Sequence, residues 1–132
     1  MLNTMVEEKN ITEKLETVLK RLLASNRDIT IVIVTTMEGL PILSILPRGY
    51  DETRISAMVA TLLSLSERTV VDMEIGVFKQ IFIKGVDGYL LIFDAEPAVL
   101  AVSTTEKAKL GLVFLECERA SHEISKILKN EK

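Results

Sequence analysis

The chain has 132 residues, which is enough for one domain with a sizeable core, and 48% of them are hydrophobic. The formal net charge of −3 argues against nucleic acid as the main partner, because phosphate binding requires a basic surface. No apolar run approaches the roughly 20 residues of a membrane span, and residues 1–10 lack the pattern of a secretory signal. We therefore expect a cytoplasmic protein without direct membrane insertion, and the high apolar content suggests an interface.

The first predicted element is a helix. Residues 1–10 are expected to be a flexible segment or the start of this helix, since Thr4 with Glu7 and Asn10 with Glu13 are alternative capping pairs. We expect a single domain over residues 11–129. From residue 11 apolar side chains recur at helical spacing until residues 25–28 break the pattern, and they are Ile11, Leu15, Val18, Leu19 and Leu22.

A hairpin is predicted next. Residues 29–36 are β-branched almost throughout and apolar at both alternating sets of positions, which is typical of a strand covered on both faces. Residues 37–39 predict a tight turn, and residues 40–46 a returning strand. Pro41 cannot donate a ladder hydrogen bond, so this second strand is expected at an edge of the sheet.

Residues 51–71 predict the central helix, with Asp51 as its cap and no Gly or Pro inside it. One broad arc is apolar and suits a core: Ile55, Met58, Val59, Leu62, Leu63, Leu65 and Val70. The opposite arc carries small residues that let another backbone come close, with charges beside them: Ala57, Ala60, Thr61, Ser64 and Val71, then Glu67 and Arg68. Two interpretations stay open: the helix lies between two layers of its own domain, or a second chain covers the small residues.

Three strands and a last helix follow. Residues 74–84 and 89–95 predict a second hairpin around Gly85 and Gly88, and residues 98–103 a fifth strand. Residues 107–129 predict a helix in which Gly111 lowers stability, so we expect another part of the chain to pack closely against it. Its apolar face leaves out Leu112 and Leu115 and consists of Leu110, Val113, Phe114, Cys117, Ala120, Ile124 and Leu128. This order of elements predicts a three-layer α/β (α+β) sandwich, with an antiparallel sheet between helices.

The sequence contains no signature of an enzyme. Cys117 is the only cysteine, so it forms neither an internal disulfide nor a cysteine-based metal site, and it does not align with His122 as a catalytic pair. We interpret Cys117 as a small core residue. No cluster has metal-ligand spacing, and no GxxxxGK[ST] or GxGxxG loop is present to hold phosphates. We therefore expect no catalytic residue, no metal and no cofactor.

Several strings, in this order and spacing, resemble the roadblock family, which is named for dynein light chains and includes prokaryotic regulators of Ras-like GTPases. The resemblance covers residues 11–128. It depends on the turn at residues 38–41, the small-residue helix, the turn at residues 87–90, the strand at residues 98–102 and the helix start at residues 109–112. The chain departs from the family at Phe114 and Cys117 of the last helix, to which we assign no special role.

The resemblance implies a five-stranded antiparallel sheet of order 2-1-5-4-3, with one helix on one face and two on the other. It also implies a dimer, with itself or a paralogue, in which the second helices pack together and the third strands pair. The small-residue face and the long, proline-free third strand fit this arrangement. The expected dimer or partner interface consists of Ala57, Ala60, Thr61, Ser64, Arg68, Val71, Val77, Lys79 and Ile81.

For function, the resemblance implies a non-enzymatic regulatory or scaffold module whose dimer binds a small Ras-like GTPase and modulates its nucleotide cycle or localisation. We assign no arginine finger, because Arg48, Arg54 and Arg68 are better explained by solvation. One alternative is a subunit of a larger motor or membrane-tethering scaffold. Another is a small-molecule sensor with a pocket under the central helix, although the sequence offers no polar cluster for such a pocket.

Overall fold

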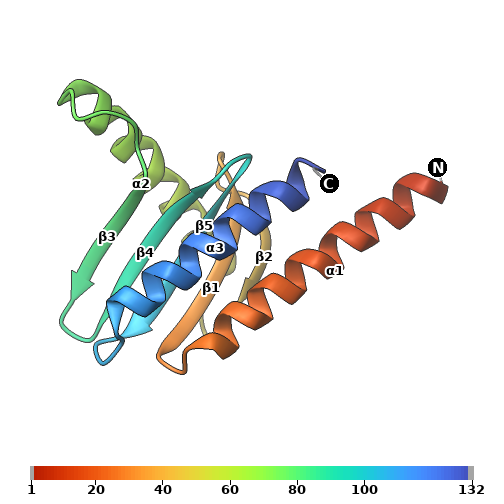
Figure 1. Ribbon diagram of the computed structural model, residues 1–132, viewed down its shortest axis with the longest axis horizontal. Helices are drawn as coiled ribbons and strands as arrows, with labels where there is room; N and C mark the ends of the chain where they lie inside the picture. Colours follow the sequence, from red (N-terminus) through yellow and green to blue (C-terminus); the bar gives the residue numbers. More distant parts are fainter. Residues whose placement is uncertain (1, 131–132) are drawn as a thin grey trace.

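The computed structural model describes residues 2–130 (Figure 1). Within the first helix it describes side chains at position 6 and from position 10 onward. None of the described helices is long and apolar enough to span a membrane. The elements in chain order are α1 (Leu2–Ser25), β1 (Ile29–Thr36), β2 (Pro41–Ile45), α2 (Glu52–Asp72), β3 (Gln80–Gly85), β4 (Gly88–Ala95), β5 (Ala98–Thr105) and α3 (Leu110–Leu128).

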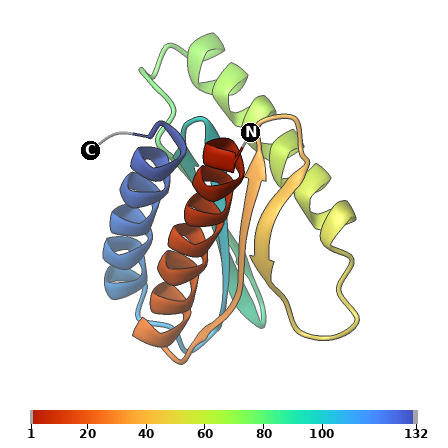
Figure 2. The ribbon, with the colours of Figure 1, turned by 90° about the vertical axis from the view of Figure 1, so that its right-hand side faces the viewer.

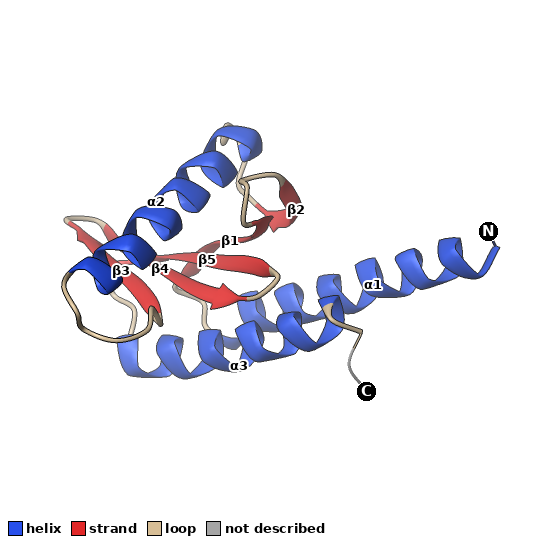
Figure 3. Ribbon diagram, turned by 90° about the horizontal axis from the view of Figure 1, so that it is seen from above, coloured by secondary structure: helices blue, strands red, loops and turns tan. Residues whose placement is uncertain are grey.

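The strands form one antiparallel sheet of order β2-β1-β5-β4-β3. Helices α1 and α3 lie side by side on one face, and α2 lies on the other (Figures 2 and 3). The predicted three-layer fold and strand order are therefore confirmed. The edge position of the strand that carries Pro41 is confirmed too, and β3 forms the opposite edge.

Alternating side chains of the strands build two cores, one on each face of the sheet. Val32 and Val34 of β1 point to the core under α1 and α3, which contains Leu15 and Leu19. Between them, Ile33 points to the smaller core under α2. The buried members of this second core are Ile33, Val59, Leu63, Ile92, Val99 and Ala101. Because β1 is apolar on both faces, helices must cover the sheet on both sides.

The turn between β1 and β2 fixes the position of α2. Asp51 caps the helix, because its Oδ1 accepts a hydrogen bond of 3.2 Å from the backbone N–H of Arg54. Gly39 has a φ of 94°, and a Cβ there would lie 3.1 Å from Ala57 Cα and 3.2 Å from Ala60 Cβ. The chain's own turn therefore packs against two of the small residues, at one end of the small-residue face.

Strand β3 is shorter than predicted, because it begins at Gln80 and not at residue 74. The chain reverses direction after α2 through positive φ angles at Glu74 (55°) and Gly76 (105°). Phe78 then packs with Ile81 in the core under α2, although strand alternation would turn it to the other face. The prediction depended on the hairpin glycines Gly85 and Gly88, which do not mark where the strand begins.

Helix α3 begins at Leu110, three residues later than predicted. The preceding residues form a turn in which Ala108 N donates to Thr105 O at 3.3 Å. The expectation of close packing at Gly111 is wrong, because nothing lies within 4 Å of a Cβ built there. Phe114 has a structural role: its ring lies 5.8 Å from that of Phe93 and 6.2 Å from that of Phe82.

Cys117 is fully buried in the core under α1 and α3, as predicted. Burial raises the pKa of its thiol from 9.0 to about 12, and the charge of Glu116 contributes to the increase. His122 on the same helix is exposed. The thiol therefore stays neutral in the folded protein at ordinary pH, which makes it a packing group and not a nucleophile.

Gly88 and Gly111 offer a matched test of the packing. A Cβ at Gly88 would overlap the backbone oxygen of Thr104 on β5, so we expect Gly88→Ala to lower the free energy of unfolding by about 1–3 kcal/mol. Gly111→Ala should be neutral or stabilise by up to about 1 kcal/mol. Urea unfolding followed by circular dichroism measures both, and equal effects would contradict the register of β4 against β5.

The burial of Cys117 predicts a pH dependence. The unfolded chain releases the thiol proton above its ordinary pKa of 9.0, whereas the folded chain holds it until about pH 12. The contribution to stability is complete below pH 9 and is lost as the pH rises from 9 to about 12. We expect the free energy of unfolding to fall over this pH range by more in the parent than in Cys117→Ala. Urea unfolding at several pH values measures the difference. Rapid alkylation of the native thiol at pH 8 would contradict the burial.

Candidate functional site

Helix α2 covers only part of its face of the sheet. It packs mainly against β1, β2 and β5, and between its second half and β3 a hollow lined by Leu65, Phe78 and Ile81 is left open. The helix therefore has two free flanks. We call the flank beside the β1–β2 turn the turn-side surface, and the flank facing β3 and β4 the strand-side groove.

The turn-side surface is a shallow depression of about 500 Å³. Its floor is made of small side chains, so it stays open, and the Thr61 hydroxyl is already satisfied by the Ala57 carbonyl at 2.8 Å. Ala60 is only 7% exposed because the Gly39 turn packs against it. The lining residues are Met37, Glu38, Ala57, Ala60, Thr61, Ser64, Leu65 and Arg68.

Two opposite charges stand on the turn-side surface. Glu38 is exposed and has no ion pair among residues 2–130. Arg68 has a side chain that is 81% exposed, and its Nε lies 3.9 Å from Asp72 Oδ2 on the same helix. An exposed pair at this distance contributes little, so both charges are available to a partner.

The strand-side groove consists of two hollows, one beside β3 and one over β1, β5 and the start of β4. One, of about 310 Å³, separates the second half of α2 from β3 and is lined by Leu65, Val70, Phe78 and Ile81 together with Ser66, Thr69 and Gln80. The other, of about 190 Å³, lies under the first half of α2, and its lining is Ile31, Ile33, Ile55, Met58, Val59, Leu62, Leu90, Ala101 and Ser103. Ser103 is the one polar residue there, which favours protein side chains over a polar ligand as occupants.

The structure divides the predicted interface between these two flanks. Ala57, Ala60, Thr61, Ser64 and Arg68 meet on the turn-side surface. Ile81 lies across the helix, in the strand-side groove. The remaining three belong to neither flank: Val71 is exposed near the end of α2, and Val77 and Lys79 lie in the loop before β3.

Sequence reasoning missed two residues beside the groove. Met58 and Leu65 were assigned to the core arc, yet they are 54% and 62% exposed. Both lie at the margin of that arc, where a side chain is buried only if the sheet extends far enough beneath the helix. The loop after α2 adds further exposed apolar side chains that continue from Val71, namely Met73, Ile75 and Val77.

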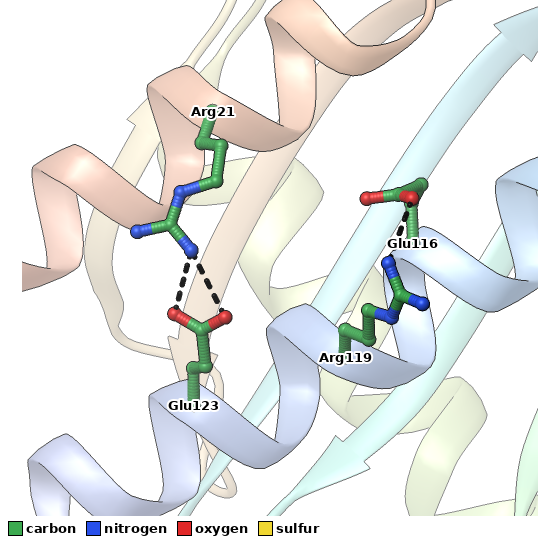
Figure 4. Close-up of polar contacts among 4 residues, drawn as sticks. All are labelled: Arg21, Glu116, Arg119 and Glu123. Carbon is green, nitrogen blue, oxygen red and sulfur yellow. Dashed lines mark hydrogen bonds and ion pairs between the residues drawn. The ribbon is translucent and has the colours of Figure 1, made fainter.

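The opposite face of the protein has its central charges paired. Arg21 of α1 donates two hydrogen bonds of 3.0 Å to the carboxylate of Glu123 on α3 (Figure 4). On α3 itself, Arg119 lies 3.5 Å from Glu116. These four charges cancel in two pairs, of which only Arg21 with Glu123 joins α1 to α3. Arg48 and Arg54 are exposed and line neither flank of α2.

Comparison with known proteins agrees with this architecture. A family model of the Roadblock/LC7 domain matches residues 14–104. Uncharacterized protein MJ1340 of Methanocaldococcus jannaschii is 34% identical over 92 residues, which are 70% of this chain and 81% of that protein. MglB of Myxococcus xanthus has a similar fold, with a TM-score of 0.82 and 24% identity over 89% of this chain and 96% of that one.

A second solved structure, MglB with a tetrameric arrangement, gives a TM-score of 0.84 at 19% identity and covers 91% of each chain. At these identities the likeness to the MglB structures concerns the fold. The family model covers more than half of this chain, and the archaeal relative exceeds 30% identity. The chain therefore belongs to the Roadblock/LC7 domain family.

Proposed function

We propose that this chain is a non-enzymatic regulatory or scaffold module of the cytoplasm, which pairs with itself or a paralogue and binds a small Ras-like GTPase. Membership of the Roadblock/LC7 family and the likeness to MglB support this proposal, and one of those MglB structures is a tetrameric arrangement. The observation that carries it is the incomplete cover of the sheet by α2.

Pairing would cover the strand-side groove. The edge of β3 contains no proline, so its free backbone groups can pair with the same strand of a second copy. A two-fold axis beside this edge would continue the sheet and place the second α2 beside the first. Met58 and Leu65, exposed in one copy, would then pack between the helices, and Ile81 would lie next to the axis.

The turn-side surface would stay free in such a dimer, because it lies on the other flank of α2. We place the GTPase there, against the exposed Ala57, Thr61, Ser64 and Arg68. The module would act by binding one nucleotide state of the GTPase more tightly than the other, since a ligand shifts an equilibrium only through differential affinity. Arg68 serves as a contact in this proposal and is given no catalytic role.

Pairing is tested by Met58→Asp. We expect the parent to be a dimer at micromolar concentration and the variant to be a folded monomer, because a carboxylate would be buried between the two α2 helices without a partner. The dissociation constant should rise at least about 100-fold. The control is Leu40→Asp, which changes a residue that is 65% exposed outside both flanks. Sedimentation velocity that gives a monomeric parent, or equal effects of both changes, would contradict the proposal.

Binding of the GTPase is tested by capture from an extract of the source organism. Captured proteins are identified by mass spectrometry and their nucleotides by chromatography. We expect a Ras-like GTPase with guanine nucleotide on the parent, and at least about tenfold less on Thr61→Lys, which fills the turn-side surface. Thr53→Lys, an exposed threonine on the same helix outside that surface, should bind like the parent. Recovery of a large complex without any GTPase would favour the scaffold alternative.

A further inference from the structure

We propose that a hollow beside α3 binds a small molecule that carries both an ammonium and a carboxylate group, which is the chemistry of a free amino acid. The hollow has a volume of about 250 Å³ and lies between α3, the end of β4 and the segment that leads into β3. We call it the α3 hollow. Aromatic, polar and charged side chains line it: Phe78, Lys79, Gln80, Phe93, Asp94, Glu118, Ser121 and His122.

Charges of both signs line the α3 hollow without neutralising one another. Lys79, Asp94 and Glu118 are exposed, and none of them forms an ion pair with any side chain that the structure describes. The Asp94 Oδ1 accepts a hydrogen bond of 2.9 Å from the Glu96 N–H, which holds this carboxylate in position. A simple anion would be repelled by the two carboxylates, and a simple cation by the ammonium. A ligand with both kinds of charge can satisfy all three groups.

The floor of the α3 hollow is aromatic. Phe93 is 4% exposed and Phe78 is half-buried, so the two rings offer apolar area to the carbon chain of a ligand. Aromatic rings also attract ammonium groups. The exposed Gln80 and His122 add hydrogen-bonding groups at the rim. The Ser121 hydroxyl is already bonded to a carbonyl of its own helix at 2.8 Å, so it needs no partner from the ligand.

Other classes of ligand fit this hollow less well. Among the described residues, no group of three His, Cys, Asp or Glu side chains could hold a metal ion. A nucleotide would bring its phosphates against Asp94 and Glu118. The volume is below the roughly 300–1,000 Å³ of pockets for drug-sized ligands, which favours a compact molecule. Because two carboxylates face one ammonium, we expect amino acids with a second positive charge, such as lysine, to bind best.

The α3 hollow is linked to the strand-side groove, because Phe78 and Gln80 line both. The segment that carries them follows the positive φ angles of Glu74 and Gly76 and leads into β3. A ligand in the α3 hollow would hold this segment in place, and we expect it to strengthen the pairing of two copies through the β3 edge. Pairing would then strengthen ligand binding by the same factor. Only this consequence rests on the proposed function.

The experiment is isothermal titration calorimetry of the full chain with three related probes. L-lysine has a carboxylate and two ammonium groups, L-norleucine lacks the second ammonium, and cadaverine lacks the carboxylate. We expect L-lysine to bind with a dissociation constant of about 1 mM or lower. The other two should bind at least about threefold more weakly, because each leaves a charged group of the hollow without its partner.

Two variants identify the partners of the ligand's charges. Lys79→Gln should weaken the binding of L-lysine by about three- to tenfold, but not that of cadaverine, which has no carboxylate. Glu118→Gln should weaken both, because both carry ammonium groups. The controls are Lys84→Gln on β3 and Glu106→Gln before α3, which change the same residue types at exposed positions outside the hollow. Both should bind L-lysine like the parent, and circular dichroism checks that every variant is folded.

The proposal is overturned if L-lysine does not bind at concentrations up to about 10 mM, if L-norleucine and cadaverine bind as tightly as L-lysine, or if the control variants weaken binding equally. Sedimentation velocity tests the link to pairing. At a concentration of L-lysine near its dissociation constant, the dimer should tighten more in the parent than in Glu118→Gln, and an unchanged dimer would contradict the link. A parent that binds L-lysine but stays monomeric would support the site and contradict pairing through β3.

Discussion

The contact of the Gly39 turn with α2 is the constraint on which the arrangement of this protein depends. Gly39 adopts a φ of 94°, and Ala57 and Ala60 leave no room for a larger residue at that turn. The hairpin of β1 and β2 is thereby fixed against the helix. Because α2 is held over this side of the sheet, it packs mainly on β1, β2 and β5 and leaves part of β3 exposed. One local contact therefore sets both flanks of α2, the shallow depression beside the turn and the groove beside the strands.

Simple dimensions explain why the two faces of the sheet differ. Five strands at about 4.8 Å spacing span roughly 20 Å, and a helix with its side chains is about 10 Å wide. Helices α1 and α3 together match the sheet on one face, and their facing charges, Arg21 and Glu123, neutralise each other. The single helix on the other face covers about half. Exposed apolar side chains remain on α2 and on the loop that follows it, such as Met58, Leu65 and Met73. A group of this kind is typical of an interaction site.

Much of this fold could be predicted from local sequence. The bounds of β1 agree with the prediction because β-branched residues on both faces permit little else, and Asp51 caps α2 as expected. The predictions that failed concern features that depend on distant parts of the chain. Met58 and Leu65 lie within the apolar arc of α2. Whether they are buried depends on how far the sheet extends beneath the helix, and the strands of that sheet come from other parts of the chain. Phe78 does not continue the alternation of β3, because it packs in the core under α2. Gly111 has no neighbour within 4 Å of a Cβ built on it.

The central strand of the sheet is the last to be synthesised. β5 pairs with β1 on one side and with β4 on the other, so it joins two hairpins that are otherwise separate. A two-stranded hairpin is marginally stable alone in water, and the helix that packs beside α1 follows β5 in the chain. Almost the whole domain must therefore be synthesised before its two hairpins can be joined. Until β5 has emerged, the exposed edges of both hairpins are open to wrong pairing, and they depend on rapid completion of the domain or on chaperones.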